Sequence, residues 1–182
     1  MKLRIVAGTR GGRLIDAPPG RRTRPTGERV REAWFSALGE VVVGASMADL
    51  FAGSGALGIE ALSRGARHVH FVESDRRTAE VLRNNLVALG LGERGTIARV
   101  EALAWVDRLD APLDIVLADP PYESDHGARL LERFRERPFA TQLWIEHDAA
   151  SGLERGGHWT RRYGDTRISA FRSAPQPDET TS

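Results

Sequence analysis

Short apolar segments alternate with helical patterns along most of this chain, and this alternation limits the possible folds more than any other feature. Five patterns typical of buried strands follow Gly44, at residues 47–51, 69–72, 96–100, 115–118 and 143–146. Helical patterns lie between them, at residues 56–63, 76–89, 103–109 and 128–135. Strands that alternate with helices form mainly parallel sheets with helices packed on them. The sequence therefore predicts an α/β domain.

Two further strand patterns follow, at residues 159–163 and 168–172, with Gly164 to Arg167 between them. This spacing is typical of an antiparallel hairpin, which would close one edge of the sheet and bring it to seven strands. We expect the domain to span residues 39–173. The polar tail at residues 174–182 is expected to be disordered.

The first 38 residues form a separate pattern, which we expect to be a small extension. Residues 3–7 and 13–15 read as a β-hairpin with a basic, glycine-rich tip. A Pro-Pro-Gly break and an arginine-rich linker follow it. Thr26 is a candidate N-cap for a helix that ends near Leu38, with Arg29 and Arg31 expected on its exposed face.

Positive charge is concentrated in this extension. Residues 1–31 contain nine Lys and Arg against two acids, a net charge of +7, whereas the whole chain carries only +1. A basic arm on a mildly acidic body indicates a polyanionic partner, with binding that weakens steeply as salt rises. A solvated tail is the alternative. Lys2 is the only lysine, and arginine forks onto phosphate and stacks on bases.

Composition excludes several classes of site. The 182 residues suffice for one domain with a full core, and they contain no cysteine, which excludes disulfides and thiolate catalysis. The five histidines do not have the spacing of metal ligands, so no metal is expected. No apolar run has the length of a membrane span or the character of a signal peptide. We therefore expect a cytoplasmic protein.

A glycine-rich loop at residues 49–58 ends the first strand pattern and opens a helix. Gly53 and Gly55 allow a ligand to approach the backbone closely, and Gly58 allows tight helix packing. Glu73 follows the next strand at the distance typical of an acid that binds ribose hydroxyls. These features alone fit NAD as well as S-adenosylmethionine.

Asp49 favours S-adenosylmethionine. The pyrophosphate of a dinucleotide would lie near this carboxylate and be repelled by it, whereas S-adenosylmethionine carries an ammonium and a sulfonium. Glu101 and the backbone N–H of Ala102 follow the third strand, where they could read an adenine edge. The residues expected to bind this cofactor are Asp49, Phe51, Gly53, Ser54, Gly55, Glu73, Ser74, Glu101, Ala102 and Thr26.

The tetrapeptide Asp119-Pro120-Pro121-Tyr122 directly follows a buried strand pattern. Asp119 offers a carboxylate and Pro120 a backbone carbonyl, two acceptors for the two N–H bonds of one planar amine, on a backbone stiffened by proline. Tyr122 offers a flat face for stacking a base. Asp119, Pro120 and Tyr122 are therefore the candidate catalytic residues. A strand followed by an ordinary Pro-Pro turn is the alternative.

Together, the motif at residues 49–58 and the Asp-Pro-Pro-Tyr motif resemble those of the class I S-adenosylmethionine-dependent methyltransferases, which have a Rossmann-like fold. The N-terminal blocks Arg4 to Gly8, Arg10 to Arg13 and Arg24 to Phe35 are similar to those of one family, RsmD, the 16S ribosomal RNA guanine-N2 methyltransferases. The resemblance extends from about Leu3 to Phe171. Glu28 stands where that family commonly has Asp, and Glu101 stands where related enzymes often carry Asp or Asn. Both residues keep an acceptor oxygen.

The resemblance implies methyl transfer from S-adenosylmethionine to the N2 amine of a specific guanine in 16S ribosomal RNA, free or within a small subunit or its assembly intermediate. It also places Thr26, Arg29 and Glu32 near the methionine end of the donor or its entrance. We expect a monomer. An ion pair between Arg29 and Glu32 is the alternative there. The arginines expected to contact RNA are Arg4, Arg10, Arg13, Arg21, Arg22, Arg24 and Arg29.

Three competing functions remain open from sequence. Adenine-N6 methylation of RNA or DNA uses the same tetrapeptide, although the chain has no room for a separate DNA-recognition domain. A catalytically silent RNA-binding or assembly protein could keep the same fold, but Asp49, Glu73 and Asp119 are intact. An NAD-dependent enzyme is disfavoured by Asp49.

Overall fold

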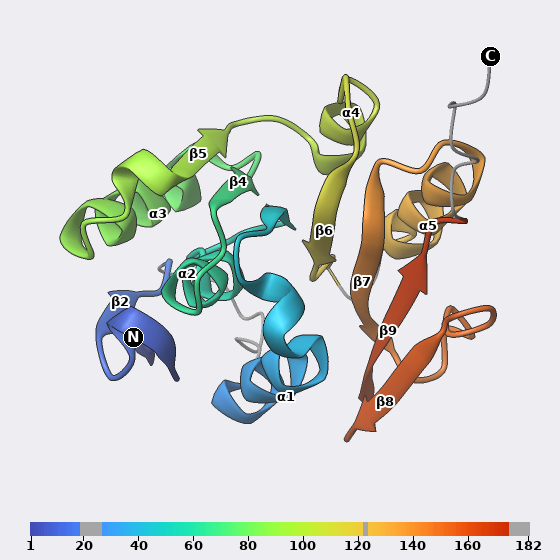
Figure 1. The fold of residues 1–182 in the computed structure, drawn as a ribbon, viewed down its shortest axis with the longest axis horizontal. Coiled ribbons are helices and arrows are strands. Elements are labelled where there is room, and N and C mark those ends of the chain that lie inside the picture. The colour runs from blue at the N-terminus through green and yellow to red at the C-terminus, as the bar shows by residue number, and fades with distance from the viewer. Residues whose placement is uncertain (19–26, 122–123, 175–182) are drawn as a thin grey trace, which may run out of the picture.

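A computed structural model describes residues 1–18, 27–121 and 124–174, and a seven-stranded sheet forms its centre (Figure 1). The strand order is β5-β4-β3-β6-β7-β9-β8. The first five strands in this order are mutually parallel, and β9 runs antiparallel to both β7 and β8. The strands are β3 (Ser46–Leu50), β4 (His68–Val72), β5 (Gly95–Ala98), β6 (Leu113–Ala118), β7 (Ala140–Asp148), β8 (Trp159–Tyr163) and β9 (Thr166–Arg172). The expected mainly parallel sheet with a closing hairpin is confirmed.

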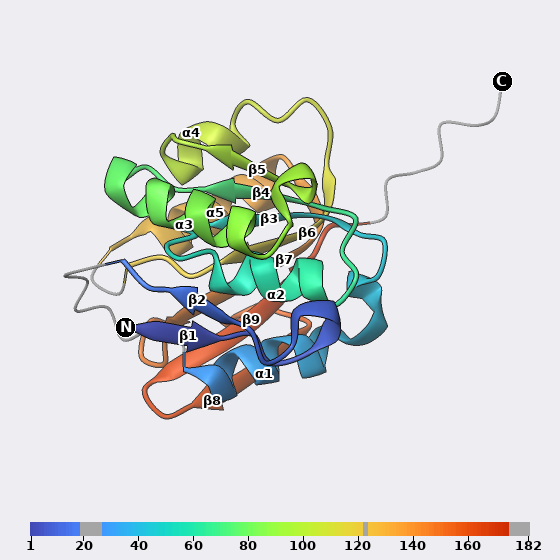
Figure 2. The same cartoon turned by 90° about the vertical axis from the view of Figure 1, so that its left-hand side faces the viewer.

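Helices cover both faces of the sheet (Figures 1 and 2). Three pack on one face through an apolar cluster that includes Trp34, Ile59 and Leu82. Two pack on the other through Leu103 and Leu130. The helices are α1 (Glu28–Leu38), α2 (Ala56–Ser63) and α3 (Arg76–Ala88) on the first face, and α4 (Ala102–Val106) and α5 (His126–Glu136) on the second.

The strand order reverses at β3, which has β4 on one side and β6 on the other. The chain leaves β3 for one side of the sheet and returns later to β6 on the other side, so the connections diverge and leave a crevice at the carboxyl ends of these strands. In open α/β sheets this crevice is where ligands bind. The topology therefore places the loop after β3 and the loop after β6 beside one another.

The N-terminal hairpin consists of β1 (Lys2–Arg4) and β2 (Leu14–Asp16) and is held against α2. The fully buried Glu60 of α2 accepts hydrogen bonds from the backbone N–H groups of Val6 (2.7 Å) and Ala7 (2.9 Å) and from Arg64 Nε (2.8 Å). Gly8 has φ +79°, and a Cβ there would lie 2.0 Å from the carbonyl oxygen of Ser63. Only glycine allows this close approach.

Several element boundaries differ from the sequence prediction. Helix α4 ends at Val106 rather than Leu109, because the next residues form a tighter turn in which Leu109 N–H bonds to Val106 O. Strand β7 is nine residues long rather than four, since it has a hydrogen-bonded neighbour on both sides. Helix α1 has Gly27 as its N-cap residue, and the expected cap Thr26 lies outside the described residues.

The expectation that Arg31 lies on the exposed face of α1 is wrong. Its side chain is only 2% exposed, and Nη2 donates a hydrogen bond to the carbonyl oxygen of Arg4 (2.7 Å). Arg31 therefore joins α1 to the hairpin. Ile5 and Ile15 of the hairpin also share the apolar cluster of α1 and α2. The division between residues 38 and 39 stays a prediction.

Candidate active site

The loop after β3 has a constrained backbone at the carboxyl edge of the sheet. Phe51 has φ +60°, a conformation that is uncommon for a residue with a side chain, and Gly53 and Gly55 have φ +57° and +81°. The Phe51 ring meets His126 at the start of α5 edge-on, with 5.5 Å between ring centroids. These backbone angles turn the chain sharply from β3 into α2. Strained backbone of this kind clusters at ligand sites.

Glu73 fixes this loop from the end of β4. Its side chain is 3% exposed, with Oε2 accepting from Gly53 N–H (3.0 Å) and Oε1 accepting from Asp75 N–H (2.9 Å). Asp75 caps α3 by accepting from Thr78 N–H (2.8 Å). The neighbouring Ser74 is exposed. A buried carboxylate therefore faces the loop expected to hold the cofactor.

Asp49 lies beneath the loop, 2% exposed, and accepts a hydrogen bond from Gly58 N–H in α2 (2.9 Å). Burial raises the pKa of Asp49 well above its usual range. The charges of Asp119 and Glu73 raise this pKa further, and only the Gly58 hydrogen bond opposes the shift. Two neighbouring carboxylates thus act on Asp49 at the crevice. Such a set suits a cationic ligand and would repel a pyrophosphate.

The acceptor motif, which begins with Asp119-Pro120-Pro121, directly follows β6 at the carboxyl ends of the parallel strands. Ala118 pairs with Leu50 on β3 and with Ile145 on β7, so Asp119 enters the crevice beside the loop after β3. Asp119 is half-buried and Pro120 is buried. Both line a cavity of about 110 Å³, together with Glu146, His147, Ser151 and Leu153. Tyr122 lies outside the described residues.

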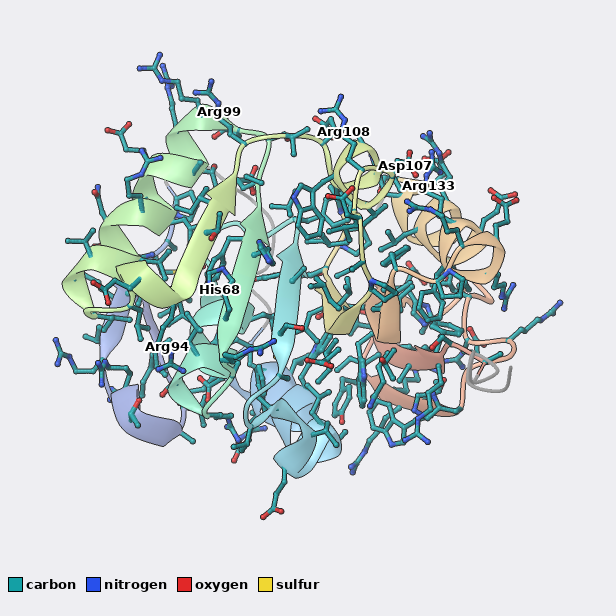
Figure 3. All side chains as sticks on the ribbon, turned by 45° about the horizontal axis from the view of Figure 1, so that its top comes forward. His68, Arg94, Arg99, Asp107, Arg108 and Arg133 are labelled. Atoms are coloured by element: carbon teal, nitrogen blue, oxygen red, sulfur yellow. The ribbon has the colours of Figure 1, made fainter. Side chains whose placement is uncertain are left out.

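The other expected cofactor residues also gather at this edge, because parallel strands place their carboxyl ends on one side. Glu101 is exposed and precedes α4, while Ala102 is the buried first residue of that helix. Figure 3 shows Asp107 and Arg133 close together beyond α4, where Arg133 Nε donates to Asp107 Oδ1 (2.9 Å) and fastens α4 to α5. The folded chain thus brings the described candidates for the donor site together.

The arginines expected to contact RNA are not equivalent. Arg4, Arg13 and Arg29 are exposed. Arg10 is half-buried, and its Nε donates to the carbonyl oxygen of Leu89 (2.8 Å), so this side chain also attaches the hairpin tip to the end of α3. No ion pair joins Arg29 and Glu32, both of which are described. Arg21, Arg22, Arg24 and Thr26 lie outside the described residues.

Two of the buried polar residues that the sequence analysis missed, Asn85 and His147, lie near the site. Asn85 of α3 is 3% exposed, and its Nδ2 donates to the carbonyl oxygens of Ser54 (2.9 Å) and Asp16 (2.9 Å), while Oδ1 accepts from Asp16 N–H (2.9 Å). It therefore joins the glycine-rich loop to the N-terminal hairpin. A polar residue on the apolar face of a helix is the sequence signal that could have revealed it.

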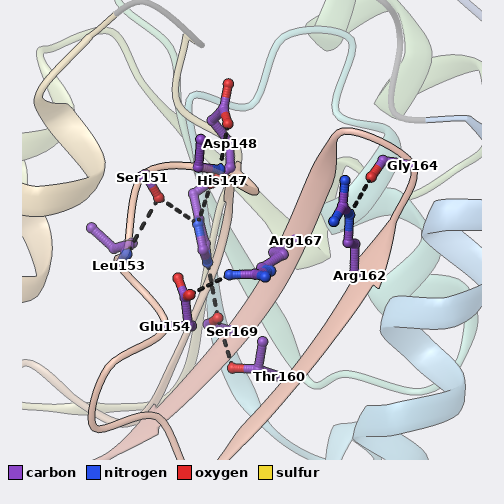
Figure 4. A network of polar contacts seen from close by, with 11 residues as sticks. His147, Asp148, Ser151, Leu153, Glu154, Thr160, Arg162, Gly164, Arg167 and Ser169 are labelled. Carbon is purple, nitrogen blue, oxygen red and sulfur yellow. Dashed lines mark hydrogen bonds and ion pairs between the residues drawn. The ribbon is translucent and has the colours of Figure 1, made fainter.

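His147 is the second. Its Nδ1 lies 2.8 Å from Ser151 Oγ, and its Nε2 lies 2.9 Å from Ser169 Oγ, which is 2.8 Å from Thr160 Oγ1 (Figure 4). Burial lowers the pKa of His147, which favours the neutral ring. This network joins β7, β8 and β9 to the loop that forms one wall of the cavity.

Two absences accompany this geometry. Across residues 1–18, 27–121 and 124–174, no cluster of three or more His, Cys, Asp or Glu residues has a geometry that could hold a metal ion. In the same ranges, no helix is long and apolar enough to cross a membrane.

Comparison with known proteins identifies the family of this chain. The family model "Conserved hypothetical protein 95" matches residues 3–169. Ribosomal RNA small subunit methyltransferase D of Escherichia coli K12 is 35% identical over 155 residues, covering 84% of this chain and 78% of that protein. The Haemophilus influenzae protein of the same name is 38% identical over 168 residues, covering 87% of this chain and 86% of that protein.

The fold agrees with this similarity. The solved structure of yhhF from Escherichia coli aligns with a TM-score of 0.84 and 29% identity, covering 97% of this chain and all of that one. With the glycine-rich loop, the acids at the ends of β3 and β4 and the Asp-Pro-Pro motif after β6 in place, the chain belongs to the RsmD family of class I S-adenosylmethionine-dependent methyltransferases.

Proposed function

We propose that this protein transfers a methyl group from S-adenosylmethionine to the exocyclic N2 amine of a specific guanine in 16S ribosomal RNA. The observation that carries the proposal is the position of Asp119 and Pro120, which enter the crevice beside the loop after β3 and line one cavity. The relatives' names support ribosomal RNA of the small subunit as the substrate. We further propose that the enzyme acts in the cytoplasm as a monomer.

The residues at this edge would act mainly by positioning and by electrostatics. S-adenosylmethionine supplies an electrophilic methyl group, and transfer breaks its S–C bond, forms the N–C bond and leaves a neutral thioether. Asp119 Oδ and the Pro120 carbonyl oxygen would each accept one N–H of the amine and so aim its nitrogen. Attack makes the amine acidic, and Asp119 or water takes the released proton. Tyr122 would stack on the base.

The acids at the donor side would favour a positively charged ligand. Asp49 and Glu73 are almost fully buried at the glycine-rich loop, where a sulfonium and an ammonium would gain more from their charge than in bulk water. Glu73 is proposed to bind the ribose hydroxyls. Glu101 and Ala102 N–H are proposed to read the adenine edge. The exposed Arg4, Arg13 and Arg29 would hold RNA phosphates.

Donor affinity should depend on the ionisation of Asp49. Its pKa is raised in the free protein, so a cationic donor that stabilises the carboxylate lowers this pKa and releases a proton on binding. Affinity should therefore increase as pH rises towards the raised pKa of Asp49. The substitution Asp49→Asn keeps an acceptor for Gly58 N–H but removes the charge, and we expect it to weaken donor binding about tenfold or more.

Calorimetric titration of both proteins with S-adenosylmethionine, from about pH 5 to 7.5, checks this expectation below the range in which the donor's own α-amino group loses its proton. The rise of donor affinity with pH that is expected for the wild-type protein should be absent in Asp49→Asn. If donor affinity depends on pH equally in both proteins, a group other than Asp49 causes the dependence.

The function itself is tested by transfer of labelled methyl to substrates that lack the modification, followed by nucleoside analysis. We expect label in N2-methylguanosine of 16S RNA, offered free and within small ribosomal subunits, and none in duplex DNA. Comparison of the two RNA substrates identifies the preferred form. Label in N6-methyladenosine would instead support the adenine-specific alternative. Tight donor binding without any transfer would support a silent RNA-binding protein.

A further inference from the structure

Glu146 lies next to the acceptor motif at the carboxyl edge of the sheet. Ala118 on β6 pairs with Ile145 on β7, so Asp119, which directly follows β6, is a neighbour of Glu146 on β7. Adjacent strands lie about 4.8 Å apart. Both carboxylates line the cavity of about 110 Å³ that Pro120 also lines. One planar ligand in this cavity could therefore meet both acids.

The position of Glu146 is fixed by the strands around it. Its side chain is 5% exposed, and Thr166 on β9 donates a hydrogen bond from Oγ1 to Glu146 Oε1 (3.3 Å). Asp148, the other β7 acid on this cavity, is exposed, and its Oδ1 accepts from Ala150 N–H (2.6 Å). Figure 4 shows the Asp148 side chain directed away from the His147 network. Glu146 is thus the acid of β7 that is buried beside Asp119.

The chemistry of the target base suits a second carboxylate. Guanine presents N1–H and the N2 amine side by side, so three N–H bonds point from one edge. Adenine has an acceptor at N1, next to its N6 amine. An ionised carboxylate only accepts hydrogen bonds. A carboxylate opposite N1 would therefore bind guanine and repel the lone pair of adenine.

We propose that Glu146 accepts the N1–H of guanine while Asp119 and Pro120 hold its N2 amine, which makes Glu146 the residue that selects guanine over adenine. This inference rests on the proposed guanine-N2 function and assigns its specificity to one side chain. It gives a role to the buried acid of β7 that lies beside Asp119 in this cavity. The hydroxyl of Thr166 then positions Glu146 rather than contacting the base.

The test uses 2-aminopurine, which keeps the 2-amine but has an acceptor at N1. Once the methylated position is known, small subunits are reconstituted from ligated 16S RNA with guanine or 2-aminopurine there. Wild-type kcat/KM should favour guanine on the order of 100-fold, because a site built to bind an N–H rejects an analogue that lacks it. In Glu146→Gln the amide N–H can donate to N1, and this preference should fall about tenfold or more.

The matched control is Asp148→Asn, which removes an acid from the same cavity and keeps an acceptor for Ala150 N–H. The preference of this variant for guanine over 2-aminopurine should equal the wild-type value. Donor binding and thermal unfolding are measured first for every variant. If Glu146→Gln does not fold, Thr166→Val replaces it, and this variant should also lower the preference for guanine.

If Glu146→Gln keeps the wild-type preference for guanine over 2-aminopurine, or if Asp148→Asn shifts this preference equally, the role assigned to Glu146 is wrong. The proposed function would still stand in either case, provided that the wild-type enzyme methylates guanine. If the wild-type enzyme methylates no guanine, both the proposed function and this inference are wrong.

Discussion

Replacing Asp119 with alanine should lower kcat for methyl transfer on the order of 10²- to 10³-fold while leaving the Kd for S-adenosylmethionine much less changed. The carboxylate is proposed to aim the acceptor amine through a hydrogen bond from N–H, which strengthens as attack gives the amine nitrogen positive charge. Removal of the carboxylate therefore slows the chemical step. Asp119 follows β6 directly and is half-buried. Single-turnover transfer to small ribosomal subunits, measured at saturating donor, checks this expectation.

The matched control is Asp114→Ala, at the amino end of β6, the strand that Asp119 follows. Asp114 Oδ2 accepts from Ser46 N–H (2.7 Å) and Ser46 Oγ (2.9 Å), far from the carboxyl ends of the strands. Its loss should destabilise the fold by about 1 kcal/mol or less without changing kcat. Near-wild-type turnover in Asp119→Ala would rule out the proposed role of this carboxylate.

The second large effect concerns the donor. Replacing Glu73 with alanine should weaken S-adenosylmethionine binding on the order of 100-fold, because the variant loses the proposed hydrogen bonds to the ribose and the acceptor that holds Gly53 N–H. The Gly53 and Asp75 N–H groups would also lose a buried acceptor, so the melting temperature should fall. Calorimetric titration at a temperature where the variant remains folded measures the affinity.

Two further variants separate binding from folding. Glu73→Gln keeps one acceptor oxygen and should lie between wild type and alanine in both measurements. Glu80→Ala, an exposed acid on α3, should leave donor affinity unchanged. If Glu73→Ala binds the donor as tightly as the wild-type protein, then Glu73 serves only to shape the loop.

Much of the fold follows from local pattern. Apolar runs of strand length, alternating with amphipathic segments, correctly predicted all seven strands of the main sheet, and α2 matches its predicted residues from Ala56 to Ser63. Errors fell at element ends and at polar residues. Helix α4 is shorter than its apolar pattern, and β7 extends through His147, whose ring is buried by partners from β9 and the following loop.

The sequence by itself determined the α/β architecture, the glycine-rich loop and the identity of the acids at the strand ends, because hydrophobic period, glycine spacing and charge sign are local properties of the chain. Only the tertiary structure decided which of these acids lie together. The pairing of Ala118 with both Leu50 and Ile145 is what places Asp119 beside Glu146 and the loop after β3. The inward direction of Arg31, Asn85 and Glu60 likewise depends on carbonyl and N–H groups supplied by segments distant in sequence. Side-chain partners across such distances are set by strand register and packing, which no local pattern records.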